Sequence, residues 1–234
     1  MGESSEVKVV GAWTSPFVMR PRIALNIKNV NYSFVEENLA KKSELLLKSN
    51  PVYKKVPVLI HGDKPICESL VIVEYIDEAW SSGPSILPSD PYDRATAHFW
   101  ATYINEKWPP AAQAIGLAKG EEAKKAAVES ARAILAVMEG GFKQCSKGKA
   151  FFGGDRIGYV DIAFGSFLAW IRAREIVLDC KLLEPAHTPE LVKWEVRFRQ
   201  DPAVVGVMTD TDKLVEFAWS IIDKIRNVPT HLPK

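Results

Sequence analysis

The sequence predicts a two-domain protein in which an N-terminal domain of mixed strands and helices (α+β) precedes an all-helical domain. Strand patterns alternate with helix patterns in the first third of the chain and nearly vanish afterwards. Between the two parts, the stretch SSGPSILPSDP (81–91) is rich in Ser and Pro and has no hydrophobic period, which is typical of a linker. With 234 residues, of which 47% are hydrophobic, the chain is long enough for two cores. We therefore expect domains over 1–81 and 92–234, joined by a linker over 82–91.

The first part has the element order β-α-β-α-β-β-α. The expected elements are, in order, a strand over 7–13, a helix over 16–29, a strand over 31–37, a short helix over 43–50, a hairpin over 56–68 with its turn at 61–64, and a helix over 69–80. The strand–helix–strand start predicts a parallel pair of strands joined by a right-handed crossover. Because Pro21 has no N–H to pair with the Phe17 carbonyl, we expect a kink in the first helix.

The second part carries helix patterns almost exclusively. The expected helices span 92–108, 121–141, 160–175, 189–201 and 211–225. We expect Pro109–Pro110 to end the first of them and Gly140–Gly141 to end the second. The third is apolar almost all round until Arg172, which predicts a central, buried helix. Arg172 and Arg174 are expected to lie at its solvated end.

Composition argues against several functional classes. The 30 basic and 29 acidic residues nearly cancel, so no overall positive field attracts nucleic acid or an anionic membrane. Three scattered cysteines without a C-x-x-C pair argue against a disulfide framework and for a reducing compartment, and the four histidines lack metal-ligand spacing. The start, MGESSEVKVV, does not resemble a secretory signal, and no apolar run is long enough to span a bilayer. We expect a cytoplasmic (cytosolic) protein that binds no metal.

A serine stands where the first apolar run gives way to the first helix, in AWTSPFVMRPRIAL (12–25). Ser15 can cap that helix, with Pro16 at the first helical position, where a missing N–H costs nothing. It can equally be an exposed hydrogen-bond donor at the positive end of the helix, a place that favours an anion. The local sequence fits both interpretations.

Further residues of the first part fit one binding site for a small, peptide-like ligand. Glu68 can pair an ammonium group, and Ser69, at a helix N-terminus, can donate to a carboxylate. Lys42 and Lys55 can hold a second carboxylate. A cis Val56–Pro57 bond would turn the Val56 backbone groups outward as a free edge for a peptide. Glutathione, with one amine and two carboxylates, has the required shape.

Four stretches of the chain match one known enzyme family. They are WTSPF (13–17), NPVYKKVPVLIHGDKPICESLVIVEYIDEAW (50–80), LPSDPYDRA (87–95) and FFGGDRIGYVDIA (151–163). On these stretches the sequence resembles the plant tau-class glutathione S-transferases. The resemblance implies the cytosolic glutathione transferase fold, with a thioredoxin-like N-terminal domain and an all-helical C-terminal domain, and a homodimer. It also implies a stress-response enzyme of detoxification that conjugates glutathione, its co-substrate, to small hydrophobic electrophiles and needs no other cofactor.

The resemblance assigns roles to individual residues. Ser15 matches the catalytic serine, and Pro57 matches the family's cis-proline. The glutathione-binding positions are matched by Lys42, Lys55, Val56, Pro57, Glu68 and Ser69. The candidates for the hydrophobic pocket, about half of which we expect to line it, are Phe17, Trp108, Trp170, Phe217, Ile221 and Lys224.

The sequence departs from the family pattern in its central helix. Gly158 stands where the family's capping box has Ser or Thr, so Asp161 is expected to accept the Gly158 N–H without a reciprocal side-chain bond. We therefore expect a structural role for Asp161. Pro109–Pro110 replaces ordinary helix at a pocket wall, so the family's substrate preference does not transfer.

Ser15 is expected to stabilise a thiolate and not to be a nucleophile itself. A thiol of pKa ~8.5 is only a few per cent thiolate at neutral pH. A charge-assisted hydrogen bond contributes about 1.5–3 kcal/mol and a helix N-terminus about 0.3–1 kcal/mol. Because one pKa unit corresponds to roughly 1.4 kcal/mol, both together would lower the thiol pKa by about one or two. Ser15 lies in no G-x-S-x-G elbow and has no evident His or Asp partner of a hydrolase.

Two other functional classes stay open. A ligandin-like carrier would keep the apolar pocket with little turnover, whereas the leading hypothesis extends from conjugation to glutathione-dependent peroxidase activity. A thiol–disulfide oxidoreductase would need an attacking thiolate, which Ser15 does not supply. Cys67 is expected to be a small buried hydrophobe and not a reactive thiol.

Overall fold

A four-stranded sheet forms the centre of the N-terminal half. The structure is a computed structural model that describes residues 6–226, with side chains as far as residue 222. The strands, in chain order, are β1 (Val7–Gly11), β2 (Ser33–Glu36), β3 (Val58–His61) and β4 (Lys64–Cys67). In space the order is β2-β1-β3-β4; β1 is parallel to β2 and antiparallel to β3, and β3 and β4 form the predicted hairpin.

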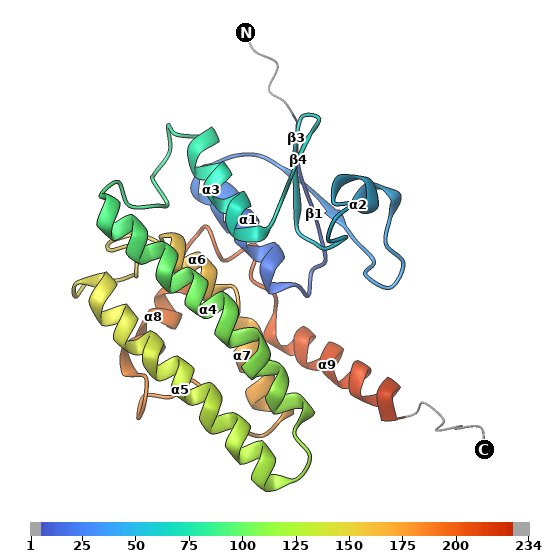
Figure 1. The fold of residues 1–234 in the computed structure, drawn as a ribbon, viewed down its shortest axis with the longest axis vertical. Coiled ribbons are helices and arrows are strands. Elements are labelled where there is room, and N and C mark those ends of the chain that lie inside the picture. Colours follow the sequence, from blue (N-terminus) through green and yellow to red (C-terminus); the bar gives the residue numbers. More distant parts are fainter. Residues whose placement is uncertain (1–5, 227–234) are drawn as a thin grey trace.

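Helices cover both faces of this sheet. The helices of this half are α1 (Pro16–Ile27), α2 (Glu44–Ser49) and α3 (Ser69–Ala79). α1 and α3 pack together on one face, and α2 lies on the other (Figure 1). Neighbouring residues of β1 therefore face different helices: Val9 joins the main core, whereas Val10 packs with Leu46 of α2. A strand covered on both faces needs apolar side chains at neighbouring positions, which Val9 and Val10 supply, although Lys8 interrupts the apolar run. The predicted β-α-β-α-β-β-α order is confirmed, and α1 runs unbroken through Pro21.

Within the described residues, the second half is built from helices. They are α4 (Pro91–Leu117), α5 (Glu121–Ser146), α6 (Tyr159–Gly165), α7 (Leu168–Val177), α8 (Pro189–Gln200) and α9 (Thr211–Arg226). α4 and α5 form a long pair, and α6 packs against α4, α8 and, across the halves, α1 (Figure 1). Every residue of α6 is buried, as predicted for a central helix. Between residues 6 and 226, no helix combines the length and the apolar character needed to cross a membrane.

The prediction that Pro109–Pro110 ends a helix is wrong. α4 continues through both prolines to Leu117. Its buried face explains this, because one row of apolar side chains continues at helical spacing across the prolines, each at most 2% exposed: Ile104, Trp108, Ala112 and Ile115. A proline in a helix costs about 3 kcal/mol, and burying one large apolar side chain contributes about 1.5–3 kcal/mol. Several such side chains outweigh the two prolines.

The predicted end of the next helix at Gly140–Gly141 is also wrong, since α5 runs on to Ser146. Gly141 does not end the helix; it allows close packing between α5 and α4. A Cβ at this position would lie 2.9 Å from the nearest ring atom of Trp100 in α4. The missing side chain thus lets the Trp100 ring of α4 pack directly against the backbone of α5.

The single helix predicted over 160–175 is divided into α6 and α7 at Ser166 and Phe167. The Phe167 N–H donates to the carbonyl three residues earlier, at 3.0 Å, which is a tighter turn than an α-helix makes. At this bend the Ser166 hydroxyl donates to the Ala163 carbonyl (3.1 Å) and accepts from Nε of Arg20 (3.2 Å). The break therefore places the Ser166 hydroxyl where the buried Arg20 side chain of α1 needs a hydrogen-bond acceptor.

Arg172 and Arg174 do not lie at a solvated helix end, contrary to expectation. The Arg172 guanidinium forms ion pairs with Glu175, at 2.7 Å, and with Glu195 of α8, both of them buried carboxylates. The Arg174 guanidinium lies 5.2 Å from the centre of the Trp170 ring. Glu195 lies 23 residues from Arg172 along the chain, so the local sequence does not show this ion pair.

Candidate active site

Ser15 lies between β1 and α1 and leaves its hydroxyl available. Its backbone is extended (φ −83°, ψ 119°), as expected of the residue that precedes a helix, and Pro16 is the first helical residue. The Ser15 side chain forms no capping hydrogen bond. Of the two interpretations of this serine, the geometry favours a half-buried donor without a capping partner at the helix N-terminus over a cap.

A cavity of about 340 Å³ opens beside this helix terminus. Its walls are Phe17, Asn50, Tyr53, Lys55, Val56, Pro57, Glu68 and Ser69. The structure thus brings together five of the six predicted glutathione-binding residues, and the Val56–Pro57 bond is cis, as predicted. Lys42 is exposed before α2 and does not line this cavity. Asn50 and Tyr53 are lining residues that the sequence analysis missed, although they lie inside the stretch that carries the resemblance.

Glu68 has an unusual backbone at the edge of this cavity. Its φ is +69° and its ψ is 115°, a conformation that costs a non-glycine residue about 1–3 kcal/mol. Glu68 precedes α3, and Ser69 is the first residue of that helix. A glycine would adopt this backbone conformation without strain, whereas the chain has a glutamate here. Such strain is typical of a residue that takes part in binding.

Arg20 is a buried residue behind the cavity that contacts two of its lining residues, Phe17 and Ser69, and it was missed by the sequence analysis. Its side chain is fully buried in α1. Its hydrogen bonds reach Ser166 Oγ (3.2 Å), Ser69 Oγ (3.0 Å), Asn105 Oδ1 (2.8 Å) and the Ala163 carbonyl (2.9 Å). Burial lowers the pKa of the guanidinium to about 9. The only sequence signal is an arginine inside an otherwise apolar segment, FVMRPRIAL, where a solvated face is the ordinary interpretation.

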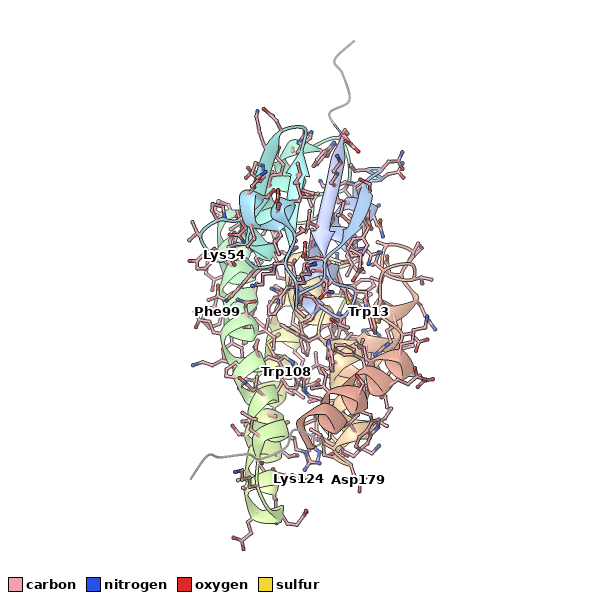
Figure 2. The ribbon with its side chains drawn as sticks, turned by 90° about the vertical axis from the view of Figure 1, so that its right-hand side faces the viewer. Trp13, Lys54, Phe99, Trp108, Lys124 and Asp179 are labelled. Carbon is pink, nitrogen blue, oxygen red and sulfur yellow. The ribbon has the colours of Figure 1, made fainter. Side chains whose placement is uncertain are left out.

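Aromatic side chains from the second half lie against the segment that carries Ser15. Nε1 of Trp170 donates to the Thr14 carbonyl at 2.7 Å, directly before Ser15. The Phe217 ring of α9 lies 6.5 Å from Trp170 and 5.6 Å from Trp13, centre to centre. Trp13 is 39% exposed and lies beside α9 (Figure 2). Two predicted pocket residues thus meet near Ser15, together with Trp13, which was not predicted.

The other four candidates for the hydrophobic pocket lie in different environments. Phe17 lines the cavity of the predicted glutathione site and packs edge-on against Phe167, with ring centres 5.6 Å apart. Trp108 is 1% exposed and belongs to the core of the helical half (Figure 2), so its prediction as a pocket wall is corrected. Ile221 is exposed on α9. Lys224 lies in α9, but its side chain is outside the described residues.

Asp161 has the structural role that was expected of it. The carboxylate is fully buried and accepts from the N–H groups of Phe152 (2.9 Å), Gly153 (2.8 Å) and Gly158 (2.9 Å), and from Nε1 of Trp194 (2.7 Å). Burial raises the pKa of this carboxyl to about 6, against the opposing effect of these hydrogen bonds. Gly158 has no side chain with which to complete a capping box, as predicted. Asp161 thus holds the loop before α6 in place.

The cysteines are not activated. Burial, and next to it the charge of Glu68, raises the pKa of the Cys67 thiol, which donates to the Ser49 carbonyl. Burial also raises the pKa of Cys180, and that of Cys145 to about 11. A thiol with a raised pKa is a poor nucleophile at neutral pH.

Comparisons with known families agree with this geometry. The family descriptions "Glutathione S-transferase, N-terminal domain" and "Glutathione S-transferase, C-terminal domain" match residues 5–78 and 92–202. Glutathione S-transferase U17 of Arabidopsis thaliana is 60% identical over 222 residues, which cover 94% of this chain and 98% of that protein. The probable glutathione S-transferase GSTU6 of Oryza sativa subsp. japonica is 50% identical and covers 95% of this chain and 97% of its own length.

Solved structures share the fold over nearly the whole chain. The tau-class glutathione S-transferase of mango, Mangifera indica, has a TM-score of 0.91 and 62% identity, covering 94% of this chain and 100% of its own. A rice glutathione S-transferase, solved in complex with glutathione, has a TM-score of 0.85 and 35% identity, with the same coverage.

Proposed function

The chain belongs to the plant tau class of the glutathione S-transferases, and we propose that it joins the sulfur of glutathione to small hydrophobic electrophiles while Ser15 holds that sulfur as a thiolate. The family membership makes the chain a transferase of the EC 2.5.1.18 type that binds glutathione. The role of Ser15, the electrophile class and the assembly are the proposal. The observation that carries it is an uncommitted serine hydroxyl directly before α1, two residues ahead of Phe17, which lines a cavity together with five predicted glutathione-binding residues; Ser15 itself is not among the lining residues.

In this proposal the cavity binds glutathione by its charged ends. Glu68 pairs the ammonium group, and Ser69 donates its hydroxyl hydrogen to one carboxylate. Lys55 pairs the other carboxylate, with Lys42 approaching from the rim. Ser69 is suited to this role because its oxygen already accepts from Arg20, so its hydrogen is directed elsewhere.

The thiolate then forms at the end of α1. The Ser15 hydroxyl donates to the sulfur, and the positive end of α1 adds a smaller stabilisation. Neither group is consumed, so the proton leaves to solvent and the sulfur attacks the electrophile, displacing a leaving group such as chloride. No other cofactor takes part in this scheme.

The electrophile is bound by desolvation against the aromatic groups beside Ser15. Trp170 and Phe217 supply the predicted wall, and Trp13 extends it at the surface. We extend the proposal to organic hydroperoxides, which two glutathione molecules reduce to an alcohol and water while the glutathione becomes a disulfide.

We also propose that the chain forms a homodimer. Large apolar side chains are exposed in the loop around Lys54 and on α4, namely Val52 (80% exposed), Tyr53 (58%) and Phe99 (61%). Lys54 and Phe99 lie on one side of the molecule and Trp13 on the other (Figure 2). Pairing through this side would cover the apolar residues and leave the electrophile wall open. Light scattering should give twice the chain mass, and Phe99→Glu should give the monomer, whereas the exposed Val205→Glu should not.

Turnover of 1-chloro-2,4-dinitrobenzene tests the proposed reaction. In Ser15→Ala we expect kcat/KM to fall by roughly tenfold to a hundredfold, which corresponds to one charge-assisted hydrogen bond. Ultraviolet titration of the complex should show the pKa of the bound thiol rising toward that of free glutathione, with glutathione binding retained. Thr14→Ala, which removes the neighbouring hydroxyl, should leave both quantities unchanged.

Unchanged turnover in Ser15→Ala would remove Ser15 from its role. Tight binding of an apolar dye by the unaltered chain, with negligible conjugation, would favour a ligandin-like carrier. Substantial thiol–disulfide exchange by the unaltered chain would contradict the assignment of the serine, whereas Ser15→Cys is expected to gain that activity and lose conjugation.

A further inference from the structure

Ser15 is the last residue of a four-residue turn that follows β1. The Ser15 N–H donates to the Ala12 carbonyl at 3.0 Å, which closes a β-turn with Trp13 and Thr14 at its central positions. The central peptide of such a turn, which contains the Trp13 carbonyl, has two opposite orientations, and the flipped one needs a positive φ at the third residue. The φ of Thr14 is negative, so the central peptide is not flipped. Because the peptides of this turn directly precede Ser15, they determine where its side chain points.

Both central carbonyls of the turn accept hydrogen bonds from the helical half. The Thr209 hydroxyl, in the loop before α9, donates to the Trp13 carbonyl at 2.8 Å. Nε1 of Trp170 in α7 donates to the Thr14 carbonyl at 2.7 Å. These donors lie 196 and 156 residues from their acceptors along the chain. The two peptides before Ser15 are therefore each held by a side chain from outside the N-terminal half.

The two donors belong to one packed unit. α7 and α9 pack together through the buried side chain of Leu214. Trp170 and Met208, which directly precedes Thr209, pack against the same cluster. Packing of this kind holds the side chains that support a site in a defined geometry. The turn is thus anchored to a packed pair of helices.

We propose that Thr209 and Trp170 are positioning residues for the Ser15 hydroxyl. Their hydrogen bonds fix the two peptides before Ser15, so that its hydroxyl is directed at the sulfur of glutathione. A hydrogen bond weakens steeply as its distance and angle depart from the optimum, so a small displacement of the turn destabilises the thiolate. The inference rests on the proposed role of Ser15 and adds that the helices that supply the electrophile wall also control the state of the thiol.

The pKa of the bound glutathione thiol tests this proposal, since ultraviolet titration measures it without any electrophile. Thr209→Val removes the hydroxyl and keeps the branched shape, whereas Thr209→Ser keeps the hydroxyl. Trp170→Phe keeps an aromatic ring and removes the N–H. The control, Thr96→Val, removes another hydroxyl that donates to a backbone carbonyl, at 2.9 Å within α4. Thr209→Val and Trp170→Phe are also made in a Ser15→Ala chain, and calorimetry follows glutathione binding throughout.

In Thr209→Val and in Trp170→Phe we expect the pKa of the bound thiol to rise, by less than in Ser15→Ala, with glutathione binding retained. The kcat/KM for 1-chloro-2,4-dinitrobenzene should fall about threefold to tenfold in Thr209→Val. Thr209→Ser and Thr96→Val should match the unaltered chain. In the Ser15→Ala chain neither change should move the thiol pKa further, because no hydroxyl remains to be positioned.

An unchanged thiol pKa in Thr209→Val or in Trp170→Phe, beside a raised one in Ser15→Ala, would overturn this inference and leave the proposed role of Ser15 intact. A further rise of equal size in the Ser15→Ala chain would also overturn it, because the two residues would then act without the serine. An unchanged thiol pKa in Ser15→Ala would overturn the proposed role of the serine, and this inference with it.

Discussion

Nη1 of Arg20 in α1 donates to the hydroxyl oxygen of Ser69, the first residue of α3, at a distance of 3.0 Å. The same nitrogen donates to Asn105 Oδ1 of α4 at 2.8 Å. One buried guanidinium therefore joins α1, which follows Ser15, to α3, which begins at the proposed glutathione cavity, and to the helical half. The position of Ser69 depends on contacts between the two halves and not on the local hairpin alone.

Replacing Arg20 should damage both stability and glutathione binding. Arg20→Met removes the guanidinium that donates to Ser69, Ser166, Asn105 and Ala163. The Ala163 carbonyl keeps the Ser166 hydroxyl as a donor, and each buried oxygen left unsatisfied costs about 1–3 kcal/mol. We expect the free energy of unfolding in urea to fall by about 3 kcal/mol or more and the KM for glutathione to rise. Arg22→Met is the matched control, because Arg22 is only partly buried and bonds one tyrosine hydroxyl. Equal losses in both variants would contradict the central role of Arg20.

Relaxing the backbone of Glu68 should separate stability from function. Glu68→Gly removes the strain at φ +69°, which we expect to raise the free energy of unfolding by up to about 1 kcal/mol after the entropy cost of glycine. The KM for glutathione should rise at least tenfold, since the proposed partner of the ammonium group is lost. Glu68→Gln keeps the strained backbone, so it should raise KM without raising stability. A stability gain in Glu68→Gln, or an unchanged KM in Glu68→Gly, would refute this account.

The packing of α8 against the end of α6 depends on a close approach at Gly165. A Cβ at this position would lie 2.2 Å from the ring of the buried Phe198. Gly165→Ala should therefore lower the free energy of unfolding by about 1–3 kcal/mol. At Gly116 of α4 a Cβ would meet nothing within 4 Å, so Gly116→Ala should raise stability by about 0.5 kcal/mol. Thermal melts of the two variants should move in opposite directions.

The pH dependence of Cys145 alkylation should show its raised pKa. Only the thiolate reacts with iodoacetamide, and burial raises the pKa of Cys145 to about 11. In a chain that carries Cys67→Ala and Cys180→Ala, the alkylation rate should rise about tenfold for each pH unit up to the limit of the native fold. Free glutathione, the control, should level off above its ordinary thiol pKa of ~8.5. A rate that levels off near pH 9 in the folded chain would contradict the raised pKa.

Local sequence was sufficient to predict the features in which one short segment determines both the local conformation and the proposed role of its residues. Ser15–Pro16 begins a helix, the hairpin turn pairs β3 with β4, and Val56–Pro57 and Glu68–Ser69 each place two neighbouring residues at one cavity. These features depend on the conformational preferences of adjacent residues and on their order along a sheet. The pattern of a family with the same segments made the ligand recognisable as well.

Tertiary structure decided the features that join distant segments. Arg20 was indistinguishable from a solvated arginine because its four acceptors lie 49 to 146 residues away. α4 passes through Pro109–Pro110, and Trp108 enters the core and not a pocket, because burial against other helices outweighs the preferences of the local chain. Preferences within a few residues contribute a few kcal/mol at most, so sequence predicts the elements and their neighbouring motifs, whereas the summed contacts of the folded chain determine which side chains are buried and which remain free to bind.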